Sequence, residues 1–379
     1  MLTSDRRAMA KVKAIAVGKL AAVAVAGGLL FAAIAVPAVG GIGILTRTAA
    51  TKFDNLAVPE LGQLPVRSKI LDRYGHLITY YYPDNIDRVP VKFNHISPVM
   101  RQAIVAIEDS RFYQHGALDF KGTFRALLNN LENNPVQGGS TLAQQFVKNA
   151  LVLTGTTKKA RAEATSETPS RKLRELRMAV KVEHELTKNQ LLAAYLSVAY
   201  FNNQAYGIQV AAKRYFRTTA KKLTLTQSAL LAGIVENPTK YNPLAHPGFA
   251  RQRRNVVLER MAQLHDITQA EAQAAGRAPL GLDPSTSSLQ QGCTARSAKK
   301  AKAAFFCDYV LSVMSQDPAY HAAYQAMNRT GGLKIYTTLD PVDQHAAQHA
   351  VNYMVPPPPS SFNPGGNAAA EVLIQPGTG

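Results

Sequence analysis

The feature that most constrains this chain is a stretch without a charged side chain, from Leu20 to Leu45. At 1.5 Å of rise per helical residue, the stretch is long enough to cross the roughly 30 Å hydrocarbon core of a bilayer. The sequence therefore predicts a transmembrane helix over residues 20–45. A cleaved signal peptide is the alternative, although the apolar run is long for one.

The charges before this stretch predict its orientation. Residues 1–19 carry five Lys or Arg side chains and a single Asp. The positive-inside rule places this basic tail in the cytoplasm and everything after residue 45 outside. We therefore expect a single-pass plasma-membrane protein with a cytoplasmic N-terminus, and a stem over residues 46–67 before the extracellular part.

The charge balance narrows the partners of that extracellular part. The 379 residues include 43 Lys and Arg against 25 Asp and Glu, a net charge of +18. Such an excess favours an acidic partner: nucleic acid, an anionic membrane surface or a phosphorylated substrate. An extracellular position argues against nucleic acid. Because 46% of the residues are hydrophobic and only 18% are charged, the chain can bury a sizeable core.

Helical signals dominate residues 68–266. A β-hairpin is predicted first, over Lys69–Tyr82. Ser97 followed by Pro98 then marks a helix start, and capping boxes are expected where Thr141, Thr187 and Thr224 each precede a Gln by three residues. The segment 154–170 breaks the pattern and predicts a loop. The expected fold class is therefore mainly α.

The remaining residues predict a linker and the start of another region. Residues 267–331 contain Cys293 and Cys307, and an extracellular location allows these cysteines to form a disulfide, with free thiols as the alternative. Residues 332–379 then predict a strand over 332–338, a helix over 341–353, a Pro-rich linker and one more strand over 370–374.

The first chemistry-bearing segment runs from Glu108 to His115. Glu108 falls at the C-terminal end of the helix that begins at Pro98, where the negative end of the helix dipole disfavours ionisation and raises the pKa of a carboxyl group. Such a group suits general acid or base catalysis. A solvated helix end is the alternative for Glu108 and Asp109, and a structural hydrogen bond is the alternative for His115.

Two further segments are suited to phosphate. Residues 138–149 run a glycine pair into a capped helix whose polar face ends in Lys148, as a pyrophosphate site requires, although an ordinary amphipathic surface helix has the same pattern. In residues 171–175, Arg171 and Glu175 share a helix face at i,i+4 beside Lys172. This cluster is either a surface salt bridge or a group that holds a leaving diphosphate and a metal ion.

Five segments, taken together and in their order along the chain, indicate a function more strongly than any of them alone. They are EDSRFYQHGALD (108–119), GGSTLAQQFVKN (138–149), RKLRE (171–175), YLSVAYFNNQAYGIQVAAKRYF (195–216) and ALLAGIVENPTKYNP (229–243). In order and approximate spacing they resemble the glycosyltransferase family 51 (peptidoglycan glycosyltransferase) domain of class A penicillin-binding proteins, which polymerises peptidoglycan from lipid II. The chain departs from that family's pattern at Ala117, Ser197, Asn202 and Arg217.

The resemblance implies a lysozyme-like helical fold and an inverting transfer that builds β-1,4 glycan strands and releases polyprenyl pyrophosphate. It implies Glu108, Asp109 and Glu175 as catalytic residues. The residues implied to bind substrate are Phe112, His115, Ser140, Thr141, Gln144, Gln145, Lys148, Asn149, Arg171 and Lys172. A divalent cation, Mg²⁺ or Mn²⁺, stays open as a cofactor, without predicted metal ligands. Expected partners are lipid II, the nascent glycan chain, the bacterial plasma membrane and other cell-wall synthesis proteins.

Two other functions fit part of the pattern. A lysozyme-like hydrolase would use Glu108 as an acid, and an inactive cell-wall scaffold would bind partners without turnover. Residues 332–341 also resemble the start of a transpeptidase region. The patterns SxxK at 297–300 and SxN at 361–363 occur only by letter in linker sequence, and KTG is missing, so transpeptidase activity is not expected from this chain.

Overall fold

The structure is a computed structural model that describes residues 63–118, 140–155, 157–166, 168–284, 292–357, 362–363 and 369–370. The predicted cytoplasmic tail, the predicted transmembrane helix, most of the predicted stem and all but the first residue of the predicted strand 370–374 lie outside these residues. Within the described part of the chain, no helix has the length and apolar character needed to span a bilayer.

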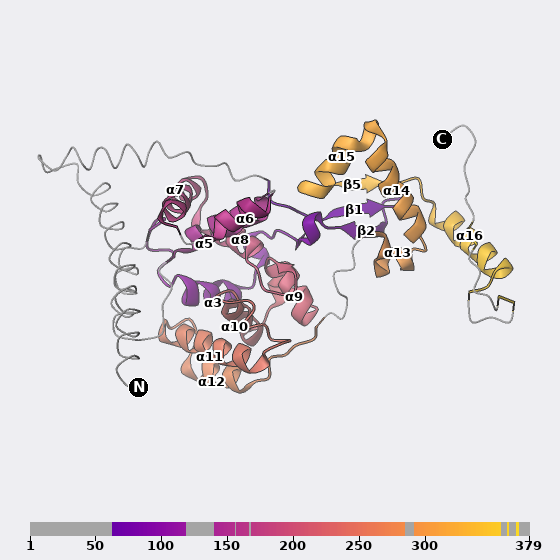
Figure 1. The fold of residues 1–379 in the computed structure, drawn as a ribbon. Helices are drawn as coiled ribbons and strands as arrows, with labels where there is room; N and C mark the ends of the chain where they lie inside the picture. The colour runs from indigo at the N-terminus through magenta and orange to yellow at the C-terminus, as the bar shows by residue number, and fades with distance from the viewer. Residues whose placement is uncertain are drawn as a thin grey trace, which may run out of the picture.

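Most of the described residues up to Asp283 form a helical unit (Figure 1). The prediction of a mainly α fold is confirmed. Its helices are α3 (Pro98–Glu108), α5 (Leu142–Thr154), α6 (Lys158–Thr165), α7 (Pro169–Glu185), α8 (Lys188–Val198), α9 (Ile208–Phe216), α10 (Leu225–Ile234), α11 (Pro247–Gln263) and α12 (Gln269–Arg277), with short 3₁₀ turns η1 (Pro83–Asn85), η2 (Phe93–His95) and η3 (Ala220–Lys222). Strands β3 (Asp87–Arg88) and β4 (Ala205–Tyr206) form a small parallel pair.

Local sequence explains where several of these helices start. The expected capping boxes at Thr187 and Thr224 are both present. The box expected at Thr141 is only half formed: Thr141 accepts the backbone N–H of Gln144, but the side-chain oxygen of Gln144 makes no return hydrogen bond. Helix α10 is apolar on every side and is buried from Ser228 to Ile234, so it forms the centre of the unit, packed against α3 and α11.

The loop expected over residues 154–170 is wrong for its central part, which forms α6. Residues 158–164 read KKARAEA and consist entirely of strong helix formers. Thr157 caps the helix by accepting the Ala160 N–H, and Arg161 donates to the carbonyl oxygen of Gly155 at 2.7 Å. These local preferences outweigh the Thr- and Gly-rich flanks on which the loop prediction rested.

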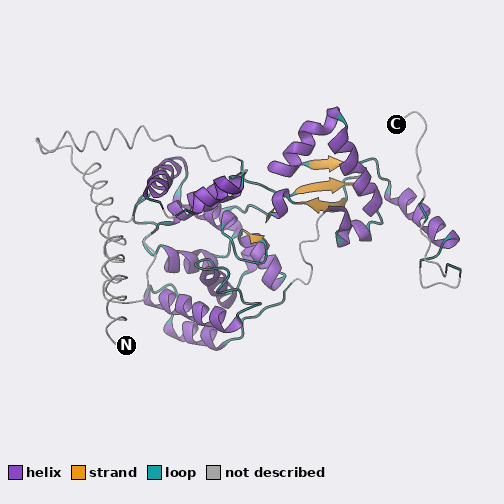
Figure 2. Cartoon of the chain, viewed as in Figure 1, coloured by secondary structure: helices purple, strands orange, loops and turns teal. Residues whose placement is uncertain are grey.

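A second group of elements forms a sheet unit, which contains most of the strand residues (Figure 2). Strand β1 (Ser68–Leu71) lies between its hairpin partner β2 (Leu77–Tyr81) and β5 (Lys334–Tyr336), which pairs with it in parallel. The unit also contains η4 (Gly292–Thr294), α13 (Arg296–Lys300), α14 (Ala304–Gln316) and α15 (Pro318–Arg329); α16 (Pro341–Met354) follows and buries no residue.

This arrangement differs from the domain boundaries expected from the sequence, which grouped the hairpin with the helices and ended the helical domain at Asp266. The hairpin residues Ile70 and Ile78 instead pack with Cys293, Cys307 and Leu339 in a separate core. Gly331 allows the segment before β5 to approach the segment before β1 closely. It has a φ of +64°, and a Cβ there would collide with the carbonyl oxygen of Val66. Helix α12 also packs into the main core, so the helical unit extends beyond residue 266.

A disulfide joins Cys293 and Cys307 inside the sheet unit, with both cysteines buried. Replacing both by Ser is expected to destabilise this unit by about 3 kcal/mol, because the cross-link restricts the unfolded chain. Limited proteolysis along a temperature ramp would detect the change as earlier cleavage within residues 292–340, while the helical unit keeps its wild-type resistance. Equal resistance of the two proteins in the sheet unit would contradict the prediction.

Candidate active site

Glu108 is the last residue of α3, and its side chain turns toward α5. Its Oε2 accepts a hydrogen bond from Nε2 of Gln145 at 2.7 Å. Burial raises the pKa of Glu108, opposed by the Gln145 hydrogen bond and by the charges of Arg253 and Lys148, while Glu236 adds to the rise. From the sequence, we expected the helix dipole to raise the pKa of Glu108. In the structure, the loss of hydration on burial is the leading cause.

Asp109 follows Glu108 but faces a different part of the molecule. Its Oδ2 accepts the backbone N–H of Leu142 at 3.1 Å, and its Oδ1 lies 2.7 Å from Nε2 of His115. Burial disfavours the charged imidazole, but the contacts with Asp109 and with the carbonyl oxygen of Gly116 together raise the pKa of His115. One carboxylate oxygen thus joins the end of α3 to the start of α5 and the other holds His115, which suits a positioning role better than the expected catalytic one.

Glu175 lies on α7 and is only 2% exposed. One of its oxygens accepts a hydrogen bond from Arg171 and the other from Lys172. Lys172 Nζ also donates to Oγ of Ser140 at 2.9 Å, which ties α7 to the residues that lead into α5. Helix α5 therefore contacts Glu108 through Gln145, and the residues just before α5 are linked to Glu175 through Ser140 and Lys172.

The contacts of Glu175 indicate whether a divalent cation, which the sequence analysis neither predicted nor excluded, could bind here. Each oxygen of Glu175 already accepts from a cationic side chain. Among the described residues, no group of three or more His, Cys, Asp or Glu side chains is placed to hold a metal ion. The donor set around Glu175 does not fit a divalent ion, and the carboxylate instead orients two cations.

The other residues implied to bind substrate divide into two groups. Phe112 is fully buried, with Nζ of Lys188 4.5 Å from its ring centre, and Gln144 is buried in α5. Thr141 is also buried and donates to the carbonyl oxygen of Ala117 at 3.0 Å. Contacts within the fold hold Phe112 and Thr141, whereas the buried Oε1 of Gln144 has no hydrogen-bond partner among the described residues. Gln145, Lys148, Asn149, Arg171 and Lys172 are only partly buried, as is Ser140. Gly138, Gly139 and Asp119 lie outside the described residues.

Sequence reasoning missed three residues around Glu108. The hydroxyl of Tyr195, on α8, donates to Oε1 of Gln145 at 3.1 Å. Arg253 Nε lies 3.0 Å from Oε2 of Glu236, and both charges act on Glu108. Tyr195 and Glu236 lie inside the segments 195–216 and 229–243, whereas Arg253 lies on α11. No local spacing links them to Glu108, since the contacts join different helices.

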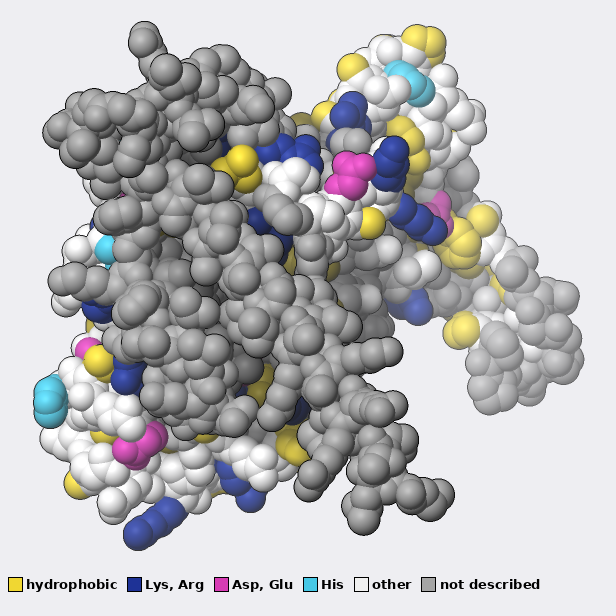
Figure 3. Space-filling model, turned by 60° about the vertical axis from the view of Figure 1, so that its left-hand side comes forward, with side chains coloured by type: hydrophobic (Ala, Val, Ile, Leu, Met, Phe, Trp, Pro, Cys, Tyr) yellow, Lys and Arg dark blue, Asp and Glu magenta, His cyan; other side chains and the backbone are white. Residues whose placement is uncertain are grey.

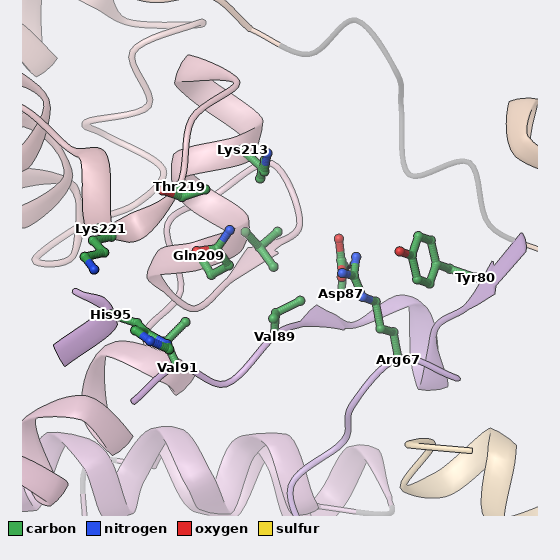
Figure 4. Close-up of a pocket in the computed structure, with 11 residues that line it drawn as sticks. Arg67, Tyr80, Asp87, Val89, Val91, His95, Gln209, Lys213, Thr219 and Lys221 are labelled. Atoms are coloured by element: carbon green, nitrogen blue, oxygen red, sulfur yellow. Dashed lines mark ion pairs between the residues drawn. The ribbon is translucent and has the colours of Figure 1, made fainter. Parts of the chain in front are cut away.

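A cavity of about 520 Å³ lies elsewhere, between β2 and α9 (Figure 4). Arg67, Lys213 and Lys221 give it a cationic lining, and its one carboxylate, Asp87, has Nη1 of Arg67 at 3.9 Å. No residue that the sequence singled out for chemistry lines this cavity. We place the candidate site at Glu108, because Glu108 contacts the helix that carries Lys148. Glu175 and its two cations are linked through Ser140 to the residues that lead into the same helix.

The chain is similar to known proteins over the region that contains Glu108 and Glu175. Residues 74–262 match the family model described as Transglycosylase. The chain is 36% identical over 220 residues to penicillin-binding protein 1F of Bacillus subtilis, covering 58% of this chain and 29% of that protein. It is 34% identical over 282 residues to penicillin-binding protein 1A of Streptococcus pneumoniae, covering 74% and 36%.

A third relative is penicillin-binding protein 1A of Mycobacterium tuberculosis, 33% identical over 296 residues, with 78% of this chain and 34% of that protein covered. The chain thus spans about a third of the length of these curated relatives. The matched region contains both glutamates, the α5 residues around them and the helices that bury them. Over residues 74–262, the chain belongs to the transglycosylase family.

Proposed function

We propose that this protein is a peptidoglycan glycosyltransferase that polymerises lipid II into β-1,4 glycan strands by inverting transfer. The observation that carries the proposal is the environment of Glu108. Burial raises the pKa of Glu108, and its carboxylate accepts a hydrogen bond from Gln145 on α5, the helix that also carries Lys148. A base next to a cation is what an attack by a sugar hydroxyl on a pyrophosphate-linked sugar requires.

In this reaction, the Glu108 carboxylate takes the proton from the attacking hydroxyl of the acceptor sugar. The new C–O bond forms at the anomeric carbon of the donor. The bond from that carbon to the pyrophosphate oxygen breaks, and its electron pair leaves with the polyprenyl pyrophosphate. Lys148, Arg171 and Lys172 are the cations available to that leaving group, and Glu175 orients Arg171 and Lys172 through the hydrogen bonds described above.

The same proposal includes a lysozyme-like fold for the helical unit and a position outside the plasma membrane, anchored by residues 20–45 with the N-terminus in the cytoplasm. The substrate and the growing chain are held by polyprenyl anchors, which favours an enzyme held at the same surface. Lys and Arg side chains are visible on both units in Figure 3, and an anionic headgroup layer would attract them.

The test is turnover of purified full chain with lipid II in detergent, followed by separation of the products by size. The proposal expects glycan strands that lengthen with time and release of polyprenyl pyrophosphate. A hydrolase would instead shorten preformed strands, and a scaffold protein would leave both substrates unchanged. The two cations held by Glu175 favour the transferase, because hydrolysis of glycan has no pyrophosphate to bind.

Replacing Lys148 by Ala is expected to weaken lipid II binding by about tenfold to a hundredfold, since a hydrogen bond to a charged group contributes roughly 1.5–3 kcal/mol. The phosphate is present before the reaction, so the apparent affinity changes more than the maximal rate. The matched control is Lys181→Ala, which removes a cation from an exposed pair on α7. Unchanged affinity in the Lys148 variant would show that this cation does not contact the substrate.

A further inference from the structure

We propose that Tyr195 is a positioning residue for the reaction: its hydroxyl holds the side-chain amide of Gln145 in the one orientation that keeps a hydrogen-bond donor on Glu108. The proposal rests on the proposed function, because it takes Glu108 as the base. It assigns a role to a residue of α8 that reaches Glu108 through Gln145 and that carries no charge at neutral pH.

The three residues form a chain of hydrogen bonds across three helices. Tyr195 Oη donates to Oε1 of Gln145 at 3.1 Å, and Nε2 of Gln145 donates to Oε2 of Glu108 at 2.7 Å. Tyr195 is fully buried, with 0% of its surface exposed. The packing of α8 against α5 therefore fixes the position of its hydroxyl relative to the amide.

The direction of these bonds follows from what each group can do. An ionised carboxylate only accepts hydrogen bonds, so the amide of Gln145 must present its nitrogen to Glu108 when Glu108 is a base. The reverse orientation would turn Oε1 of Gln145 toward the carboxylate. It would also leave the buried hydroxyl proton of Tyr195 without its acceptor, and an unsatisfied buried donor costs roughly 1–3 kcal/mol. Tyr195 thus selects the orientation that the base needs.

The groups that act on the pKa of Glu108 come from α5, from α11 and from the residues after α10. Gln145 and Lys148 on α5 favour the ionised form, as does Arg253 on α11, whereas burial and Glu236 after α10 oppose it. Gln145 provides the one hydrogen bond from a side chain among these contributions. If the Gln145 amide loses its orientation, this hydrogen bond no longer counteracts the effect of burial, and the pKa of Glu108 is expected to rise further.

The experiment replaces Tyr195 by Phe in the full chain and measures lipid II polymerisation against pH in detergent. Because protonation of Glu108 removes the base, a higher pKa moves the acid limb of the profile to higher pH. We expect turnover to fall about tenfold on the acid side and to change less than twofold on the alkaline plateau. A tenfold change corresponds to about 1.4 kcal/mol, close to the lower end of the roughly 1.5–3 kcal/mol that a hydrogen bond to a charged group contributes.

The matched control is Tyr215→Phe. Tyr215 is equally buried in the helical unit, and its hydroxyl donates to the carbonyl oxygen of Phe201 at 2.7 Å rather than toward Glu108. This variant should lose a similar amount of stability and keep the wild-type pH profile. If both Tyr variants destabilise the protein and neither moves the acid limb, Tyr195 has only a structural role and the proposal is overturned.

A second readout separates this proposal from the proposed function. The carboxyl carbon of Glu108 can be titrated by NMR in protein labelled with ¹³C-Glu, with its signal assigned by its loss in Glu108→Gln. Tyr195→Phe should raise the pKa measured there. If the pKa rises but the pH profile of turnover stays in place, Glu108 is not the base and the proposed function fails, while the hydrogen-bond chain stands. An unchanged pKa overturns the chain itself.

Gln145→Leu provides the same test if Tyr195→Phe does not fold. It removes the donor directly, so the acid limb should move in the same direction and by at least as much. Where both single variants fold, adding Tyr195→Phe to Gln145→Leu should produce no further movement, because the hydroxyl acts only through the amide. A further shift in the double variant would contradict the proposal.

Discussion

Glu108→Gln is expected to reduce glycan polymerisation by at least a hundredfold while the protein stays folded. The substitution keeps the shape of the side chain, and its oxygen can still accept the hydrogen bond from Gln145. It removes the group that takes the proton, and a positioned general base contributes typically 10²–10⁴-fold to a rate. The measurement is initial rate of strand growth with lipid II at saturating concentration, at the pH optimum of the wild type.

The stability of this variant has a predictable sign. Because burial raises the pKa of Glu108 above its unfolded value, the ionised carboxylate costs the fold stability at neutral pH. Gln carries no charge and avoids this cost, so the melting temperature should stay the same or rise. Glu259→Gln is the control, since Glu259 is exposed and likewise accepts from a Gln side chain, Gln269, at 3.2 Å. More than a tenth of wild-type turnover in Glu108→Gln would remove Glu108 from its proposed role.

The second large effect is expected from Glu175→Gln. If Glu175 orients Arg171 and Lys172 toward the leaving pyrophosphate, the loss of its charge frees both cations, and turnover should fall more than a hundredfold. Such a fall corresponds to a contribution of roughly 3 kcal/mol to the transition state. An exposed pair would contribute only about 0.3–0.5 kcal/mol. Glu175 is 2% exposed, so the low value for an exposed pair does not apply to it.

The control lies on the same helix. Glu185 pairs with Lys181 at the same i,i+4 spacing, but both side chains are more than half exposed. Glu185→Gln should leave turnover and melting nearly unchanged. Glu175→Gln should lower the melting temperature, because it breaks a buried ion pair, so turnover must be compared where both variants are folded. A folded Glu175 variant with turnover within a few-fold of wild type would leave Glu175 with a structural role only.

Much of the helical unit was predictable because helix formation depends on neighbours in sequence. The capping residues Thr187 and Thr224 and the start of α3 at Pro98 all followed from local patterns. Ser97 shows the limit of that reasoning: its hydroxyl donates to the carbonyl oxygen of Leu223 at 2.9 Å instead of capping the helix it precedes. The loop predicted over residues 154–170 failed for a local reason as well, since the helix formers inside it were given too little weight.

The sequence by itself determined local relations. It placed Glu108 at the end of a helix, and it placed Gln145 with Lys148, and Arg171 with Glu175, on shared helix faces. Only the tertiary structure decided which of these groups meet. The contacts from Glu108 to Gln145, from Lys172 to Ser140 and from Tyr195 to Gln145 join residues 37, 32 and 50 positions apart. Such contacts, and the burial that raises the pKa of Glu108, arise when helices pack through a shared core, and the spacing of residues along one helix carries no information about that packing.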